Sequence, residues 1–82
     1  MVNADQRAAI QTCKTQALSA NPQAKGRIGI DVYADNSGKP NSVSLQMQSG
    51  TIPQEFIQCV IKILQDGKYP PNSSFGILEK LP

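Results

Sequence analysis

The sequence predicts an α+β domain in which two helices pack on one face of a three-stranded antiparallel sheet, in the order helix, strand, strand, helix, strand. Three observations predict this fold. Two segments carry apolar residues at helical spacing, two adjacent segments alternate apolar and polar residues around a turn-rich stretch, and a further partly alternating segment ends the chain. The 82 residues are expected to form one domain over 1–82, with a small core and a thin stability margin.

The first helix is expected to begin at Asn3, an N-cap residue with Gln6 three positions later, and to end near Ala20 before Asn21-Pro22. Its apolar stripe consists of Ile10, Cys13, Ala17 and Leu18.

Strict alternation then predicts a strand over 27–34, with Arg27 and Tyr33 on its polar face. Residues 35–39 contain Asn36 and Gly38, which tolerate positive φ, and therefore predict a hairpin loop. The returning strand is expected to direct three residues inward: Val43, Leu45 and Met47.

A second helix is predicted over 52–66, with a capping box between Thr51 and Gln54 and with Gly67 as a left-handed C′ residue. Its apolar stripe consists of Phe56, Cys59, Val60, Ile63 and Leu64. Residues 74–81 predict the third strand, with Phe75 and Ile77 on the core face and a bulge or frayed end at Glu79, where the alternation is lost.

Cys13 and Cys59 are the only cysteines and lie centrally on the two helical stripes. If the stripes face one core, a disulfide can join the helices, which indicates an oxidising compartment. The alternative is a pair of reduced cysteines that act as small core hydrophobes.

Composition argues against several function classes. The net charge is only +2 with scattered basic residues and four aromatics, so a nucleic-acid-binding surface is not expected. No histidine is available as a base or ligand, both thiols are expected to be buried, and no phosphate-binding glycine pattern occurs. We therefore expect no enzyme activity, no catalytic residues, no metal site and no cofactor.

What remains as a candidate site is a surface. An edge strand offers unpaired backbone groups that an extended partner segment can join. The candidate contacts are the third strand, namely Phe75, Gly76, Ile77, Leu78, Glu79 and Lys80, together with Tyr33 and Arg27 on the open face of the sheet.

An ordered set of residues carries a resemblance to a known family. It comprises Cys13 with Ala17-Leu18, Asn21-Pro22, Gly26-Arg27, Asp35, Gly38, Val43, Ser49, Cys59-Val60 and Tyr69-Pro70. From Cys13 to Pro70 the chain resembles the TonB/TolA C-terminal domain superfamily, and most closely its AgmX/PglI-type domain of gliding-motility proteins. The aromatic-rich segment usual before the Pro is reduced to Gly67-Lys68-Tyr69.

The resemblance implies a non-enzymatic periplasmic domain at the end of an envelope-spanning transducer. Its parent protein would be anchored in the inner membrane through a segment outside this sequence, and it would bind an outer-envelope or periplasmic protein by strand addition. Two alternatives remain open: a small secreted inhibitor or structural module with the same α+β layer, and a thiol-redox enzyme.

Overall fold

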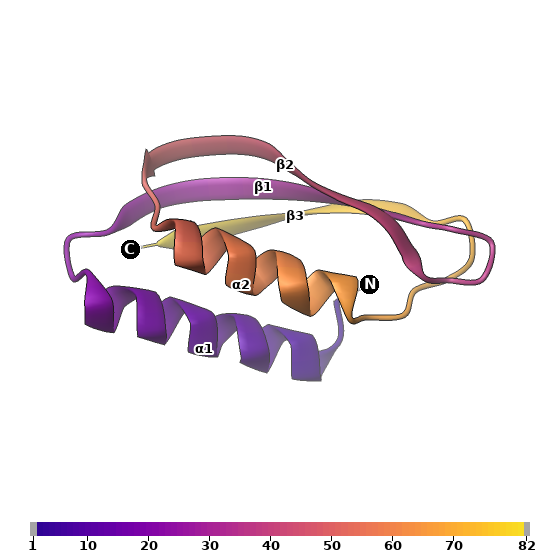
Figure 1. Cartoon of the computed structure of the whole chain (residues 1–82), viewed down its shortest axis with the longest axis horizontal. Coiled ribbons are helices and arrows are strands. Elements are labelled where there is room, and N and C mark those ends of the chain that lie inside the picture. Colours follow the sequence, from indigo (N-terminus) through magenta and orange to yellow (C-terminus); the bar gives the residue numbers. More distant parts are fainter. Residues whose placement is uncertain (1, 82) are drawn as a thin grey trace.

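The computed structural model describes residues 2–81 and has the predicted order α-β-β-α-β. Its elements are α1 (Ala4–Ala20), β1 (Lys25–Ala34), β2 (Pro40–Thr51), α2 (Gln54–Gln65) and β3 (Ser74–Leu81). The strands form one antiparallel sheet in the order β2-β1-β3, so β1 is central and both other strands are edges. Figure 1 shows the two helices running in opposite directions below the same face of this sheet. We call the other face the open face.

The core lies between this sheet and α2. Ile28, Ile30 and Val32 of β1 are fully buried and meet the apolar side of α2, whose buried residues are Phe56, Ile57, Val60 and Leu64. Cys59 and Ile63 are only half-buried, so the centre of the buried stripe is rotated from the predicted one. Helix α1 buries only four of its 17 residues, namely Gln6, Ile10, Cys13 and Ala17.

The start of α1 agrees with the predicted capping box. The backbone N–H of Gln6 donates to Asn3 Oδ1 at 2.7 Å, and the Asn3 N–H donates to Gln6 Oε1 at 3.0 Å. The other end of the Gln6 side chain reaches across to the end of α2, where its Nε2 donates to the Tyr69 hydroxyl at 3.0 Å. Tyr69 in turn donates to the Leu64 carbonyl at 2.6 Å. A buried polar cluster therefore joins the start of α1 to the last turn of α2.

The predicted capping box of α2 is wrong. Thr51 is the last residue of β2 and pairs with Lys25, and the N-cap is Pro53, which makes no side-chain capping bond. The Pro53 carbonyl instead accepts from the N–H groups of Phe56 and Ile57 at 3.1 and 3.3 Å. Ile52, which was expected inside the helix, lies between the two elements and is 8% exposed.

The predicted left-handed conformation at Gly67 is also wrong, because Asp66, the C-cap of α2, is in the right-handed region and Gly67 is not among the residues with positive φ. Space explains this glycine: a Cβ would collide with the Tyr69 hydroxyl and the Gln6 side-chain amide.

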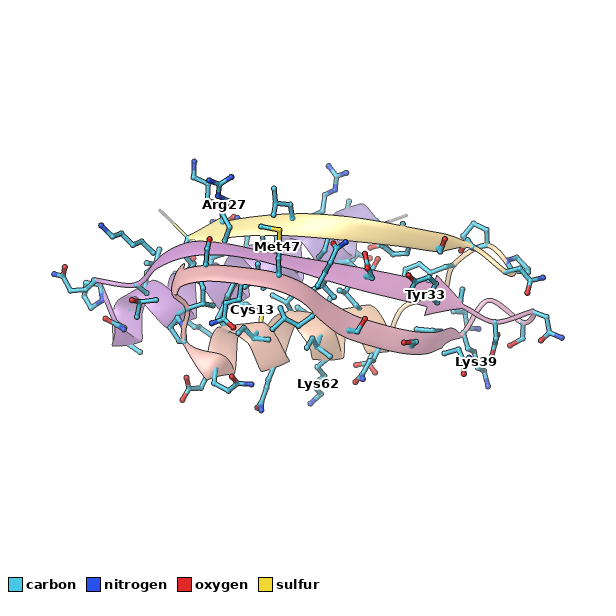
Figure 2. The ribbon with its side chains drawn as sticks, turned by 90° about the horizontal axis from the view of Figure 1, so that it is seen from above. Cys13, Arg27, Tyr33, Lys39, Met47 and Lys62 are labelled. Carbon is cyan, nitrogen blue, oxygen red and sulfur yellow. A yellow bond between two sulfur atoms is a disulfide. The ribbon has the colours of Figure 1, made fainter. Side chains whose placement is uncertain are left out.

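Met47 does not face the core as predicted. In the β1–β2 pairing, Gly29 pairs with Met47 but Ile30 pairs with Leu45, so Gln46 is an extra residue on β2. Such a bulge shifts the alternation by one residue, and Met47 lies on the open face against Gly29. Figure 2, which looks onto the open face, draws Met47 in front of the strands.

The bulge or frayed end predicted in β3 is absent. All eight β3 residues pair with β1 in one continuous register, with Glu79 opposite Ile28 and Leu81 opposite Gly26. Phe75 and Ile77 face the helices as predicted, and Glu79 and Leu81 continue the same face. The acidic residue fits there because Lys14 of α1 forms an ion pair with it at 3.0 Å.

Candidate functional site

The predicted contact residues all lie on β3 or on the strand that pairs with it, but Phe75, Ile77 and Glu79 face the helices while the others lie on the open face. Residues 75–80 belong to β3, one of the two edge strands, and Arg27 and Tyr33 lie on the open face of the neighbouring strand β1. Arg27 pairs with Lys80, and Tyr33, which is 49% exposed, pairs with Ser74. Figure 2 shows β3 with no strand of this chain beyond it.

The free edge of β3 presents a regular series of backbone groups. The Ala34 N–H donates to the Ser73 carbonyl at 2.8 Å, which identifies the side of β1 that bonds to β3. Because antiparallel pairs alternate, Phe75, Ile77 and Glu79 direct their N–H and C=O groups toward β1. The residues between them therefore direct theirs away from the sheet: Ser74, Gly76, Leu78 and Lys80. An extended segment finds four consecutive docking positions there.

The opposite edge, on β2, is interrupted. It begins at Pro40, which has no N–H, contains two register shifts against β1, and approaches its end at Gly50 with φ of 80°. Bulges and edge prolines are features that prevent strand addition in natural sheets. The two edges thus differ in kind, and only β3 offers an unbroken one.

A groove of about 520 Å³ runs between β3 and the first half of α1. Its apolar lining comes from Phe75 and Ile77 of β3 and from Val2 and Ile10 on the α1 side, with Arg7 and Gln11 as the polar α1 residues. Phe75 and Ile77 are only half-buried, since α1 does not cover them completely. A strand added to β3 would direct every second side chain toward this groove.

The charges around β3 are mainly positive. Lys80 and its cross-strand partner Arg27 lie side by side on the open face, and Arg7 lines the groove below. The Lys14–Glu79 pair is the one ion pair within residues 2–81. The remaining carboxylate near the strand is Asp31, opposite Gly76.

The centre of the open face is apolar. Met47 and Leu78, which are 46% and 58% exposed, flank Gly29 on its two sides. A Cβ at Gly29 would lie 2.9 Å from Met47 Cγ, so the glycine allows Met47 to lie over the central strand.

Cys13 and Cys59 form a disulfide between α1 and α2, with Cα atoms 6.1 Å apart. This bond is typical of proteins in an oxidising, non-cytoplasmic compartment. It lines a second groove of about 520 Å³ between the helices, together with Ala17, Pro53 and Phe56. Both thiols are used by the disulfide, so neither is a free nucleophile or metal ligand.

Within residues 2–81 no three histidine, cysteine, aspartate or glutamate side chains gather into a group that could hold a metal ion. The described helices also include none that is both long and apolar enough to cross a membrane. One carboxylate has a shifted pKa: hydrogen bonds from the Ser37 hydroxyl and backbone lower the pKa of Asp35 in the hairpin loop. Its partners are loop residues, so its role is to hold the turn.

Sequence reasoning missed the α1 half of this site, namely Val2, Arg7, Ile10 and Gln11. The helical spacing predicts Ile10 as part of the core stripe, where it is indeed buried, and Arg7 is one of the scattered basic residues of the sequence. The available signal was the weak amphipathicity of 4–20, which indicates a helix that covers its sheet incompletely.

Comparisons with known proteins add no assignment: no family model matches the sequence, and neither the curated proteins nor the solved structures include a significant match.

Proposed function

We propose that this chain is a non-enzymatic protein-interaction domain that docks an extended segment of a partner along the free edge of β3. The observation that carries the proposal is the contrast between the two edges. β3 pairs continuously over eight residues, whereas β2 contains two register shifts and begins with a proline. A domain that only had to avoid aggregation would be expected to interrupt both edges.

The proposal extends to the cellular setting. The domain works in the periplasm, at the end of an envelope-spanning transducer of the TonB/TolA type that is anchored in the inner membrane by a segment outside this sequence. Its partner is an outer-envelope or periplasmic protein. Support comes from the disulfide, which favours an oxidising compartment, and from the ordered residues between Cys13 and Pro70 that resemble that superfamily.

Proline substitution tests edge docking directly. Leu78→Pro removes one outward N–H from β3, and proline is tolerated on edge strands when its N–H position faces solvent. Gln48→Pro is the matched control on β2, because Gln48 pairs with Ile28, whose backbone groups face β3, so its own N–H points outward. Neither change removes a hydrogen bond from the sheet.

The probe is a random 12-residue peptide library displayed on phage and selected on the oxidised domain. Selected peptides, made synthetically, are expected to bind the parent domain and the Gln48→Pro variant equally. They should bind Leu78→Pro at least tenfold more weakly, with circular dichroism confirming that both variants fold. Equal binding to Leu78→Pro and the parent domain would show that the edge of β3 is not the docking site.

A further inference from the structure

We infer that the segment docked on β3 places a carboxylate beside Lys80 on the open face and directs apolar side chains into the groove between β3 and α1. This inference rests on the proposed docking at β3 and adds the chemistry of the partner. It follows from three rows of side chains that a new strand would extend: the cationic row at Lys80, the row at Leu78 and the row at Gly76.

The row of side chains at Lys80 contains two cations and no carboxylate. Arg27 and Lys80 are direct cross-strand partners on the open face, and Ser49 is the partner of Arg27 on the other side. Like charges placed directly opposite each other destabilise a sheet. Neither cation belongs to an ion pair in the described part of the chain. A strand added to β3 would place its own residue next to Lys80, and a carboxylate there would relieve the repulsion.

The other two rows set the neighbouring positions on the same face. Leu78 is 58% exposed and continues the apolar row of Gly29 and Met47. A partner residue beside Leu78 would therefore bury the most surface if it is apolar. At Gly76 the Asp31 carboxylate leans toward the edge, since a Cβ on Gly76 would lie 2.9 Å from Asp31 Oδ1. Because Gly76 has no side chain, a partner residue beside it would face the Asp31 carboxylate directly, and a basic or amide side chain fits that position.

The intervening partner residues face the groove. Apolar side chains fit there because the groove is lined by Phe75, Ile77, Val2 and Ile10. Arg7 also lines the groove and could pair with a second carboxylate of the partner. Two faces of one extended segment are thereby specified independently, which makes the match more selective than backbone pairing alone.

The overall charge agrees with an acidic partner. The residues of β3, their β1 partners and the adjoining α1 side chains include four cations and two carboxylates, namely Arg7, Lys14, Arg27, Lys80, Asp31 and Glu79. This local excess of two equals the net charge of +2 of the whole chain, so the remaining charges balance. The residues around β3 thus carry a formal excess of positive charge, which would attract and orient an acidic segment.

The test uses the peptides selected as described for the proposed function. Each acidic peptide is compared with a version in which asparagine or glutamine replaces the carboxylate assigned to the Lys80 position. The acidic form should bind about twofold to fivefold more tightly. In Lys80→Glu this preference should disappear or reverse, whereas Lys62→Glu, which changes a cation on the exposed side of α2, should leave it unchanged.

Two failures can be told apart. If the peptides lose binding in Leu78→Pro but bind equally well with and without the carboxylate, the acidic specificity is wrong and docking at β3 stands. If the peptides bind Leu78→Pro as tightly as the parent domain, docking at β3 is wrong, and the inferred acidic specificity at β3 is then wrong as well. A preference that persists unchanged in Lys80→Glu would also overturn the inference.

Discussion

Reduction of the Cys13–Cys59 disulfide should remove a large part of the stability of this domain. The two cysteines are 46 positions apart, and closing a loop of that length in the unfolded chain is valued at about 4 kcal/mol by the chain-entropy model. Domains of this size are stable by about 4 to 12 kcal/mol in total. The reduced protein is therefore expected to be marginally stable.

The assay is urea unfolding of the same protein with and without a phosphine reductant, followed by circular dichroism. Reduction keeps both sulfur atoms and so isolates the effect of the bond. The double variant Cys13→Ala/Cys59→Ala should lose roughly 1 kcal/mol more, because Cys13 is 3% exposed and its removal leaves a small cavity.

The result should also be local. Helix α1 buries only four residues and is joined to the rest by the disulfide, the Gln6–Tyr69 contact and the Lys14–Glu79 ion pair. Amide hydrogen exchange in α1 should therefore accelerate on reduction more than exchange in β1. A loss of less than 1 kcal/mol, or equal acceleration in both elements, would refute the reasoning.

Three further outcomes are expected. Tyr69→Phe should cost about 1–3 kcal/mol in urea unfolding, because the Leu64 carbonyl and the Gln6 amide lose a buried partner; a neutral result would contradict the described cluster. Folding lowers the pKa of Asp35, so its contribution is full above the unfolded value of 3.8 and is lost as the pH falls through the lowered folded pKa. The stability difference between the parent and Asp35→Asn should hence shrink below about pH 4; a difference constant from pH 2 to 7 would exclude this linkage. Lys14→Gln should cost at most about 1 kcal/mol, as measured by thermal unfolding at low salt, since its ion pair is partly exposed.

Much of the fold was predictable because local rules agree with the tertiary structure. The first helix begins at the predicted capping box, and the alternation of β1 matches its buried and exposed faces. The hairpin loop turns at Gly38, whose φ is 83°. In each case the local sequence pattern already favours the observed conformation, and the hairpin loop is also held by a hydrogen bond from the Tyr69 N–H to the Gly38 carbonyl at 2.9 Å.

The errors occur where a distant contact determines the outcome. An alternating sequence such as that of β2 is equally compatible with a straight strand and with a bulge, so the reversal of Met47 could not be predicted. In the sequence Glu79 breaks the apolar alternation of β3. It fits on the helix face because it pairs with Lys14 of α1, which lies 65 positions earlier and cannot be assigned to it from the local pattern. The same limit applies to the candidate site. The sequence pattern of 74–81 predicts the edge strand β3, but the groove beside it depends on how α1 packs against the sheet.

The disulfide and the proposed docking edge are linked through α1. The backbone groups of β3 are held by its pairing with β1, which does not involve the disulfide. The lower wall of the groove is the first half of α1, which the disulfide ties to α2 one turn beyond Ile10. The bond therefore fixes the position of one groove wall relative to the edge, which is a condition for a docked strand to be recognised by its side chains as well as its backbone. In an oxidising compartment the domain would keep this groove preformed, and binding would not have to order α1.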